Sequence, residues 1–164
     1  MKIRTLALLA LTPVALMTMA SPAVAKNAGQ GHGHGHGHHH HVTSLKTQLR
    51  GTNEVPSNAL GGHGKATIKI DGTTVCFELK VTTTTPAAAA HIHEAAVGVN
   101  GPVVLALAPI NAQGKSKGCI PNVDATLAAN LSAHPEQFYV NVHTAALPGG
   151  DIRGQLRLHD HRKH

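Results

Sequence analysis

Short runs of alternating apolar and polar residues, separated by Gly, Pro and Asn, make up most of the chain between residues 42 and 158. Alternation with a period of two is typical of β-strands that bury one face. Seven strands are predicted in this way, at residues 44–50, 64–70, 74–82, 88–93, 103–108, 138–144 and 151–158. Asp71 and Gly72 predict a hairpin turn between the second and third of them.

One segment of this region has a different pattern. Residues 124–131 are mostly good helix formers, Asp124 can cap their start, and Pro135 follows their end. We therefore expect an all-β domain over residues 42–158, a β-sandwich or barrel of about seven to eight strands with one short helix. The whole chain has 164 residues, which suits one small domain and leaves no room for a multidomain enzyme.

The first residues have the pattern of an export signal. Lys2 and Arg4 precede an apolar stretch at residues 5–17, and Ala-Val-Ala at residues 23–25 is a small-residue cleavage pattern. Residues 1–25 are thus predicted to be a signal peptide, and no second apolar stretch is long enough to span a bilayer. We expect an exported protein, periplasmic or secreted, without a retained membrane anchor; an uncleaved segment that stays as an anchor is the alternative.

Export changes the interpretation of the two cysteines, Cys76 and Cys119. In an oxidising compartment a lone pair of cysteines persists as a disulfide, so we predict a bridge between Cys76 and Cys119. A thiolate metal site is the weaker alternative, because neither cysteine belongs to a Cys-x-x-Cys motif.

Histidine is the most abundant potentially reactive residue, with 15 histidines against 14 lysines and arginines. Residues 26–41 contain many Gly and His and almost no apolar residue, so we expect a flexible, disordered arm. Its imidazoles can bind copper, zinc or nickel. They are His32, His34, His36, His38, His39, His40 and His41. Residues 159–164 form a second histidine-rich tail with His159, His161 and His164. An affinity tag is the alternative origin of the arm, although a tag does not usually follow a signal peptide.

The histidines within the domain predict a more defined site. His91 and His93 alternate along one strand, so both imidazoles lie on the same face with Cα atoms about 6.5–7 Å apart and can reach one ion. His143 shares a strand face with Tyr139 and Asn141 and can add a third nitrogen from a neighbouring strand. His63, on a predicted loop, is a possible fourth ligand.

Each of these histidines also has an ordinary structural explanation. A His-x-His pair can be a solvated strand face, and His63 can be an exposed turn residue. His134, just before Pro135, fits the end of the predicted helix and its dipole. A joint site is favoured because the histidine motifs lie at strand ends that precede loops rich in Gly and Pro, where functional groups are commonly placed.

The formal net charge of +6 does not by itself indicate a nucleic-acid partner. The basic residues are scattered along the sequence, and two Phe, one Tyr and no Trp leave no platform on which bases can stack. Nucleic-acid binding is therefore not expected.

Three ordered stretches resemble the CHRD domain, a domain first described in chordin and common in exported bacterial proteins. They are GTNEVPSNALGGHGKATIKI at residues 51–70, AAHIHEAAVGVNGPVVLAL at residues 89–107, and FYVNVHTAALPGGDIRGQL at residues 138–156. The resemblance covers nearly all of residues 42–158 and implies an all-β, immunoglobulin-like or Greek-key β-sandwich, but no settled activity. The chain departs from the family pattern at Ser57, where a second Pro is common, and at His63, which is not a family feature.

The histidine motifs also resemble those of copper-zinc superoxide dismutases. HIHE at residues 91–94 is similar to the HVHE stretch that provides two copper ligands there, and VHT at residues 142–144 is similar to the VHE stretch that provides another. This resemblance implies that Arg153 guides an anion to the metal; a solvent-facing Arg153 paired with Glu94 or Asp151 is the structural alternative. Glu94 and Asp151 are expected to orient imidazole N–H groups. The zinc-loop pattern of these dismutases is missing.

Three classes of function follow from these features. The first is a metal-binding protein that captures transition-metal ions, copper before zinc or nickel, because the Irving–Williams order favours Cu²⁺ at nitrogen ligands. The second is a copper enzyme that consumes superoxide, with Arg153 raising the local anion concentration. The third is a metal-free interaction module for a protein partner, in which the histidines hydrogen-bond across strands. The first class ranks ahead because it requires only ligands, whereas the second also requires an open site and an anion path.

Overall fold

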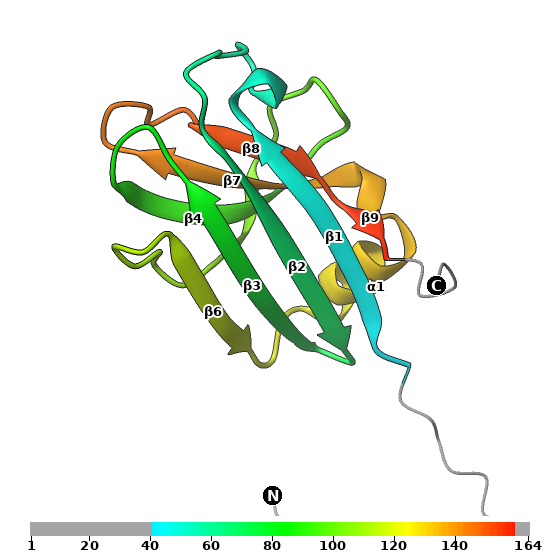
Figure 1. Cartoon of the computed structure of the whole chain (residues 1–164). Coiled ribbons are helices and arrows are strands. Elements are labelled where there is room, and N and C mark those ends of the chain that lie inside the picture. Colours follow the sequence, from blue (N-terminus) through cyan, green and yellow to red (C-terminus); the bar gives the residue numbers. More distant parts are fainter. Residues whose placement is uncertain (1–40, 160–164) are drawn as a thin grey trace, which may run out of the picture. The chain divides into compact units, whose positions relative to one another are not determined.

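The computed structural model describes residues 41–159 (Figure 1). The predicted signal peptide, the arm histidines other than His41, and His161 and His164 lie outside the described residues. The elements in chain order are β1 (Thr43–Arg50), η1 (Gly51–Asn53), β2 (His63–Asp71), β3 (Thr74–Thr82), β4 (Ala87–Glu94), β5 (Val103–Ala106), β6 (Lys115–Ile120), α1 (Ala125–Ala133), η2 (Pro135–Gln137), β7 (Phe138–Thr144), β8 (Ile152–Gln155) and β9 (Arg157–Leu158).

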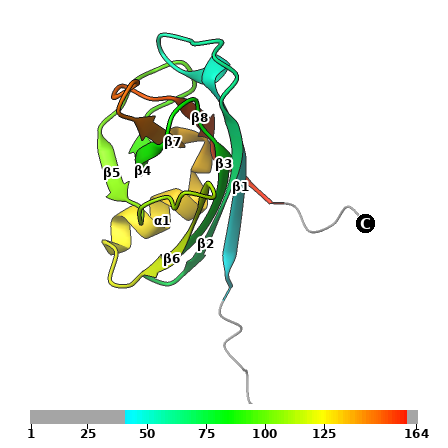
Figure 2. The same ribbon diagram turned by 60° about the vertical axis from the view of Figure 1, so that its left-hand side comes forward.

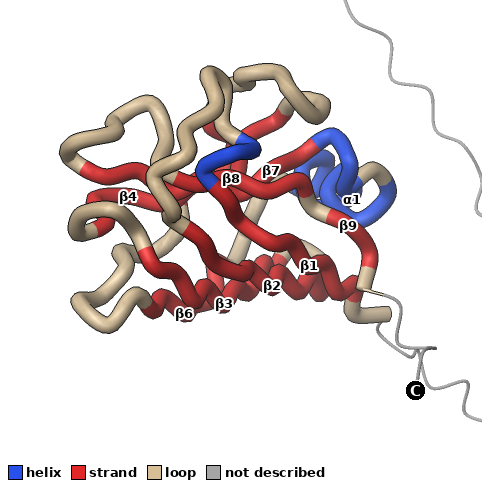
Figure 3. The backbone as a smooth tube through the Cα atoms, turned by 45° about the horizontal axis from the view of Figure 1, so that its top comes forward, coloured by secondary structure: helices blue, strands red, loops and turns tan. Residues whose placement is uncertain are grey.

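The strands form a curled antiparallel sheet. Their order is β5-β4-β7-β8-β1-β2-β3-β6, and β9 pairs with β1. Because the sheet curls, β1, β2, β3 and β6 form one layer while β4, β5, β7 and β8 form the other (Figures 1 and 2). Figure 3 shows the same strands with α1 at one end of them. The prediction of an all-β sandwich with one short α-helix is confirmed.

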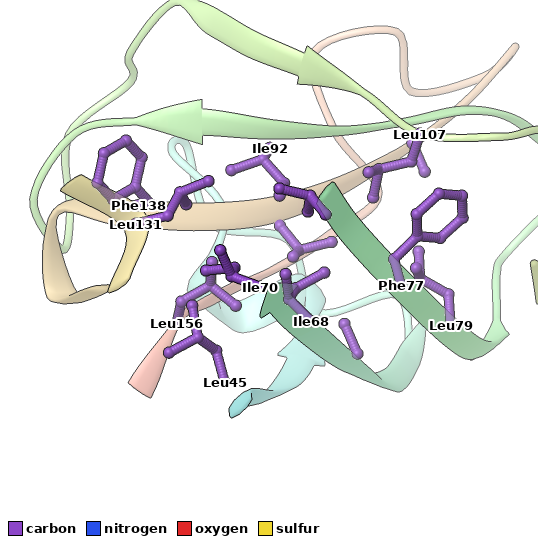
Figure 4. Close-up of a cluster of buried hydrophobic side chains, with 14 of the residues drawn as sticks. Leu45, Ile68, Ile70, Phe77, Leu79, Ile92, Leu107, Leu131, Phe138 and Leu156 are labelled. Atoms are coloured by element: carbon purple, nitrogen blue, oxygen red, sulfur yellow. The ribbon is translucent and has the colours of Figure 1, made fainter. Parts of the chain in front are cut away.

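The core lies between the two layers and follows from the alternation of apolar residues. In β3 the buried residues are Val75, Phe77 and Leu79, and the residues between them face away from the core. Ile92 of β4 lies across from this set in the core cluster (Figure 4). Leu131 of α1 is also fully buried there, so the helix closes the core at one end.

The structure corrects several predicted elements. Strand β6 has no counterpart among the seven predicted strands. The predicted strand 103–108 ends at Ala106, and the predicted strand 151–158 is two strands, β8 and β9, with the buried Leu156 between them. Asp124 caps α1 as expected, since its side chain accepts a hydrogen bond from the backbone N–H of Leu127 at 2.9 Å. Within residues 41–159, no helix is both long enough and apolar enough to cross a bilayer.

The predicted disulfide is present between Cys76 and Cys119, which lie opposite each other on β3 and β6. The bridge lies on the outer face of this layer, because the neighbouring residues Val75 and Phe77 face the core. It ties the edge strand β6 to its neighbour β3, and it closes a loop with a sequence separation of 43 residues.

Candidate metal centre

Three histidines meet on the outer face of the layer that contains β4 and β7. His91 and His93 alternate along β4. His143, on the adjacent strand β7, lies opposite Ala89 of β4. The residues between them, such as Ile92, face the core. One ring nitrogen from each of the three histidines lies within 4.8 Å of the other two. The expected convergence of these side chains is therefore present.

Backbone carbonyls fix the orientation of two of the three rings. Nδ1 of His93 lies 3.0 Å from the carbonyl oxygen of Gly101, and Nδ1 of His143 lies 3.0 Å from that of Pro148. A carbonyl oxygen only accepts hydrogen bonds, so each Nδ1 carries the hydrogen and donates it. In the neutral ring, Nε2 then keeps an available lone pair, as a metal-bound imidazole requires.

Each of the three rings has one buried nitrogen without a partner. Among the described residues, Nδ1 of His91, Nε2 of His93 and Nε2 of His143 are buried polar atoms without a hydrogen bond. A buried polar atom of this kind costs on the order of 1–3 kcal/mol unless water, an ion or another polar group satisfies it. Three such atoms grouped together fit the donor set of a transition-metal ion.

The electrostatic environment keeps two of these rings neutral. Burial lowers the pKa of His91, and the neighbouring His93 lowers it further. Burial also lowers the pKa of His143, while its hydrogen bond to Pro148 acts in the opposite direction. A lowered pKa favours the unprotonated imidazole, which is the form that binds metal.

The spacing of the nitrogens is close to that of a coordination sphere. Metal–imidazole bonds of about 2.0–2.1 Å around a tetrahedral ion place the nitrogens about 3.4 Å apart. The widest separation here is at most 4.8 Å, so the rings have to close by about 1–1.5 Å at most, within the reach of side-chain rotation. Three protein nitrogens leave one coordination position open.

The side chains of Tyr139 and Arg153 stack against the ring of His93, beside the centre. The ring of Tyr139 lies parallel to the ring of His93, with centroids 4.9 Å apart, and the guanidinium of Arg153 lies 4.7 Å from the Tyr139 centroid. The Tyr139 hydroxyl accepts a hydrogen bond of 3.2 Å from the backbone N–H of Gly101. Tyr139 thus packs on His93 and also binds Gly101, whose carbonyl orients His93.

Arg153 is a buried structural residue of this centre. It is 3% exposed, and its Nε donates to Oε2 of Glu54 at 2.8 Å. Its other nitrogens donate to the carbonyl oxygen of Val99 and to Oδ1 of Asn100. These bonds fasten the loop between β4 and β5 that carries Gly101. The structural alternative, a solvent-facing Arg153 paired with Glu94 or Asp151, is wrong. A buried guanidinium whose three nitrogens all donate to protein acceptors does not fit the anion-guiding role either.

Glu94 and Asp151 do not orient His93 and His143 as expected, because backbone carbonyls bind both Nδ1 atoms. Glu94 is exposed, and Asp151 is fully buried and accepts hydrogen bonds from the backbone N–H and the hydroxyl of Thr84. The supporting residues Glu54, Gly101 and Pro148 were not identified from the sequence. Gly101 and Pro148 act through backbone carbonyls, which leave no signal in the residue type.

The other candidate histidines lie apart from the triad. His63 is exposed at the start of β2, in register with Arg50 and Thr82, and its Nδ1 lies 3.0 Å from the carbonyl oxygen of Gly61. The possible fourth ligand is therefore not part of this group of nitrogens. His159 lies 2.8 Å from Nζ of Lys46, on the other layer, and His41 is exposed before β1.

The chain was also compared with known proteins. The family model of the CHRD domain matches residues 45–156, a range that contains all three histidines and their supporting residues. No curated protein matches the chain.

Proposed function

The chain belongs to the CHRD domain family, and we propose that it is an exported protein that captures a transition-metal ion, copper first, through His91, His93 and His143. One observation carries this proposal. Each of the three histidines offers a ring nitrogen within 4.8 Å of the other two, each ring has a buried nitrogen without a partner, and carbonyls hold two of the rings in the tautomer that binds metal.

The chemistry of the ligands supports copper as the preferred ion. Neutral imidazoles bind copper, zinc and nickel, and the Irving–Williams order gives Cu²⁺ the highest affinity among divalent first-row ions. Three nitrogen ligands from rigid strands form a partly assembled site, which reduces the ordering cost of binding.

Export is supported by two features. The sequence of residues 1–25 has the pattern of a signal peptide, and a disulfide such as Cys76–Cys119 persists in an oxidising compartment. In this function the histidine-rich arm at residues 26–41 collects ions at low affinity, and the triad holds them at higher affinity.

Capture fits the geometry better than catalysis of superoxide consumption. A dismutase needs a cation that faces the incoming anion, whereas all three guanidinium nitrogens of Arg153 are engaged inside the protein. A metal-free module whose histidines hydrogen-bond across strands is also disfavoured, because one buried nitrogen of each triad ring has no partner among the described residues.

The test has to separate the triad from the histidines outside the domain. We define the arm-silenced chain as the full-length protein in which the histidines of residues 26–41 and 159–164 are replaced by Ser. Isothermal titration of this chain with Cu²⁺ is expected to show one tight site. Electron paramagnetic resonance is expected to show nitrogen ligands. The variants His91→Ala and His143→Ala are expected to lose the tight site.

His63→Ala and His134→Ala are the matched controls, because both remove an exposed imidazole outside the triad. Both are expected to bind Cu²⁺ like the arm-silenced chain. Binding that survives His91→Ala and His143→Ala would overturn the proposed site. Competition with Zn²⁺ and Ni²⁺ tests the choice of ion, since tighter Zn²⁺ binding at the same histidines would reject copper and retain the site.

A further inference from the structure

The layer opposite the metal centre has a strongly basic outer face. All lysines and arginines of residues 41–159 except the buried Arg153 lie on β1, β2, β3, β6 and β9, at positions that face away from the core. They are Lys46, Arg50, Lys65, Lys69, Lys80, Lys115, Lys117 and Arg157. We call this surface the basic face; in Figure 1 its strands β1, β2, β3 and β6 lie side by side toward the viewer. Residues that are scattered along the sequence are thus gathered by the fold.

The centre of the basic face contains like charges in direct register. Lys65 of β2 lies opposite Lys80 of β3, and Lys80 lies opposite Lys115 of β6, so three lysines form one row across three strands. Like charges directly opposite each other destabilise a sheet. Glu78 pairs with Lys80 at 2.8 Å, which neutralises only one of these lysines. The row therefore costs stability in the isolated protein, as is common for residues that serve binding.

Two adjoining hollows run along this face. The larger one, about 840 Å³, is lined by Lys46, Arg50, Lys65 and Arg157 together with amide and hydroxyl side chains such as Gln48 and Thr67. The ion-paired Glu54 and Arg153, and Val97 and Gly98 of the loop between β4 and β5, also line it. The smaller one, about 370 Å³, is lined by Lys80 and Lys115 and shares Gln48, Arg50 and Lys65 with the first. The hollows thus form a track from β9 and β1 to β6 that presents cations at intervals and hydrogen-bonding groups between them.

The side chains along the track indicate the chemistry of the ligand. Cations pair with carboxylate or sulfate groups, and amides and hydroxyls bind sugar hydroxyls. Phe77, Phe138 and Tyr139 are all buried, so no Phe or Tyr ring of the described residues is available to stack on nucleic-acid bases. Two of the residues that line the track, Val97 and Leu158, are exposed large apolar residues, and they are too few to form an apolar surface that could enter a bilayer.

We propose that the basic face binds an acidic polysaccharide, a chain of sugars with repeated carboxylate or sulfate groups, along the track between β9 and β6. The metal centre lies on the outer face of the other layer, and none of its three histidines lines the track. Binding is electrostatic and weakens as the salt concentration rises.

The full-length chain, with a chelator present to remove metal ions, is tested for binding at low salt. The probes are alginate as a carboxylated glycan, heparin as a sulfated glycan and dextran as a neutral one, with phosphatidylglycerol vesicles and duplex DNA as other polyanionic surfaces. We expect binding to alginate or heparin and none to dextran. The variant K65Q/K80Q/K115Q removes the lysine row and is expected to bind about tenfold more weakly, because each exposed ion pair contributes a factor of about two to three.

A control with the same net charge separates a site from a general charge effect. The control is one triple variant, in which three exposed positions of α1 are changed: Ala125→Glu, Thr126→Glu and Ala129→Glu. It lowers the net charge as much as the lysine variant does, and it is expected to bind the glycan within twofold of the parent. Thermal denaturation serves as a folding check, since removal of the like-charge row is expected to raise the melting temperature. The proposal would be overturned if both variants lost glycan affinity equally, or if the lysine variant lost none. It would also be overturned by no binding to either acidic glycan, or by tighter binding to vesicles or DNA than to both acidic glycans.

Discussion

Replacement of Arg153 by Met tests the buried network behind the metal centre. The Arg153 and Glu54 side chains are only 4% and 3% exposed and lie 2.8 Å apart. Removing one partner of a buried ion pair leaves the other charge unpaired and typically costs about 3–5 kcal/mol. For a domain of this size the melting temperature is expected to fall by on the order of 10–20 °C.

Two comparisons isolate the ion pair. Arg157→Met removes an exposed arginine and is expected to change the free energy of unfolding by less than about 1 kcal/mol. The double variant Glu54→Gln/Arg153→Met removes both charges and is expected to recover part of the loss, so the two substitutions are not additive. Urea denaturation followed by circular dichroism measures all these values.

The pH dependence of the Arg153→Met variant gives a second readout. Burial raises the pKa of Glu54 in the native protein, and Arg153 opposes this shift. Without Arg153 the pKa of Glu54 rises further, because desolvation acts alone. The stability loss is then largest at neutral pH, where the carboxylate is ionised, and shrinks on acidification as Glu54 takes up a proton.

The same substitution also reports on the function of Arg153. It releases bonds to Val99 and Asn100 in the loop that orients His93, so metal affinity is expected to fall by about 10- to 100-fold. If Arg153→Met is as stable as Arg157→Met and binds copper like the parent, the buried network is refuted. Arg153 would then be a surface residue that is free to attract anions.

Two further predictions concern pH and the disulfide. Burial lowers the pKa of His91 and His143 below the usual value of 6.5. The copper affinity of the arm-silenced chain should therefore be nearly constant above about pH 6.5 and decline only on further acidification. Copper titrations between pH 5 and 8 measure this, and a loss of affinity that begins above pH 7 would contradict it. The double variant Cys76→Ser/Cys119→Ser should lose about 4 kcal/mol of unfolding free energy, because the bridge spans 43 residues. The folded fraction of this variant should keep its copper site, which lies on the other layer. A loss below about 1 kcal/mol in urea denaturation would refute the stabilising role of the disulfide.

Local alternation accounts for the parts of the fold that were predicted correctly. β3 and β7 have clear apolar positions, and the same alternation places His91 with His93 on one face. Strand β6 was missed because its inward positions include Ser116 and Gly118. A side chain at Gly118 would meet the Phe77 ring at 3.0 Å, so the strand needs a small residue where the pattern would require an apolar one.

Contacts between distant segments account for what was not predicted. Glu54 lies 99 residues before its partner Arg153, and no local pattern indicates that these two charges are buried together. The carbonyls of Gly101 and Pro148 leave no trace in residue identity, because nearly every residue has the same group. The basic face likewise depends on the register of four strands, which periodicity alone does not determine.

A crystal structure of the copper-loaded arm-silenced chain, with the ion located by anomalous scattering, would show directly whether the three histidines share one ion. We expect one copper ion about 2 Å from a ring nitrogen of each of His91, His93 and His143, with Nδ1 of His93 still bonded to Gly101 and Nδ1 of His143 to Pro148. Copper bound elsewhere, or fewer than three of these histidines on the ion, would contradict it.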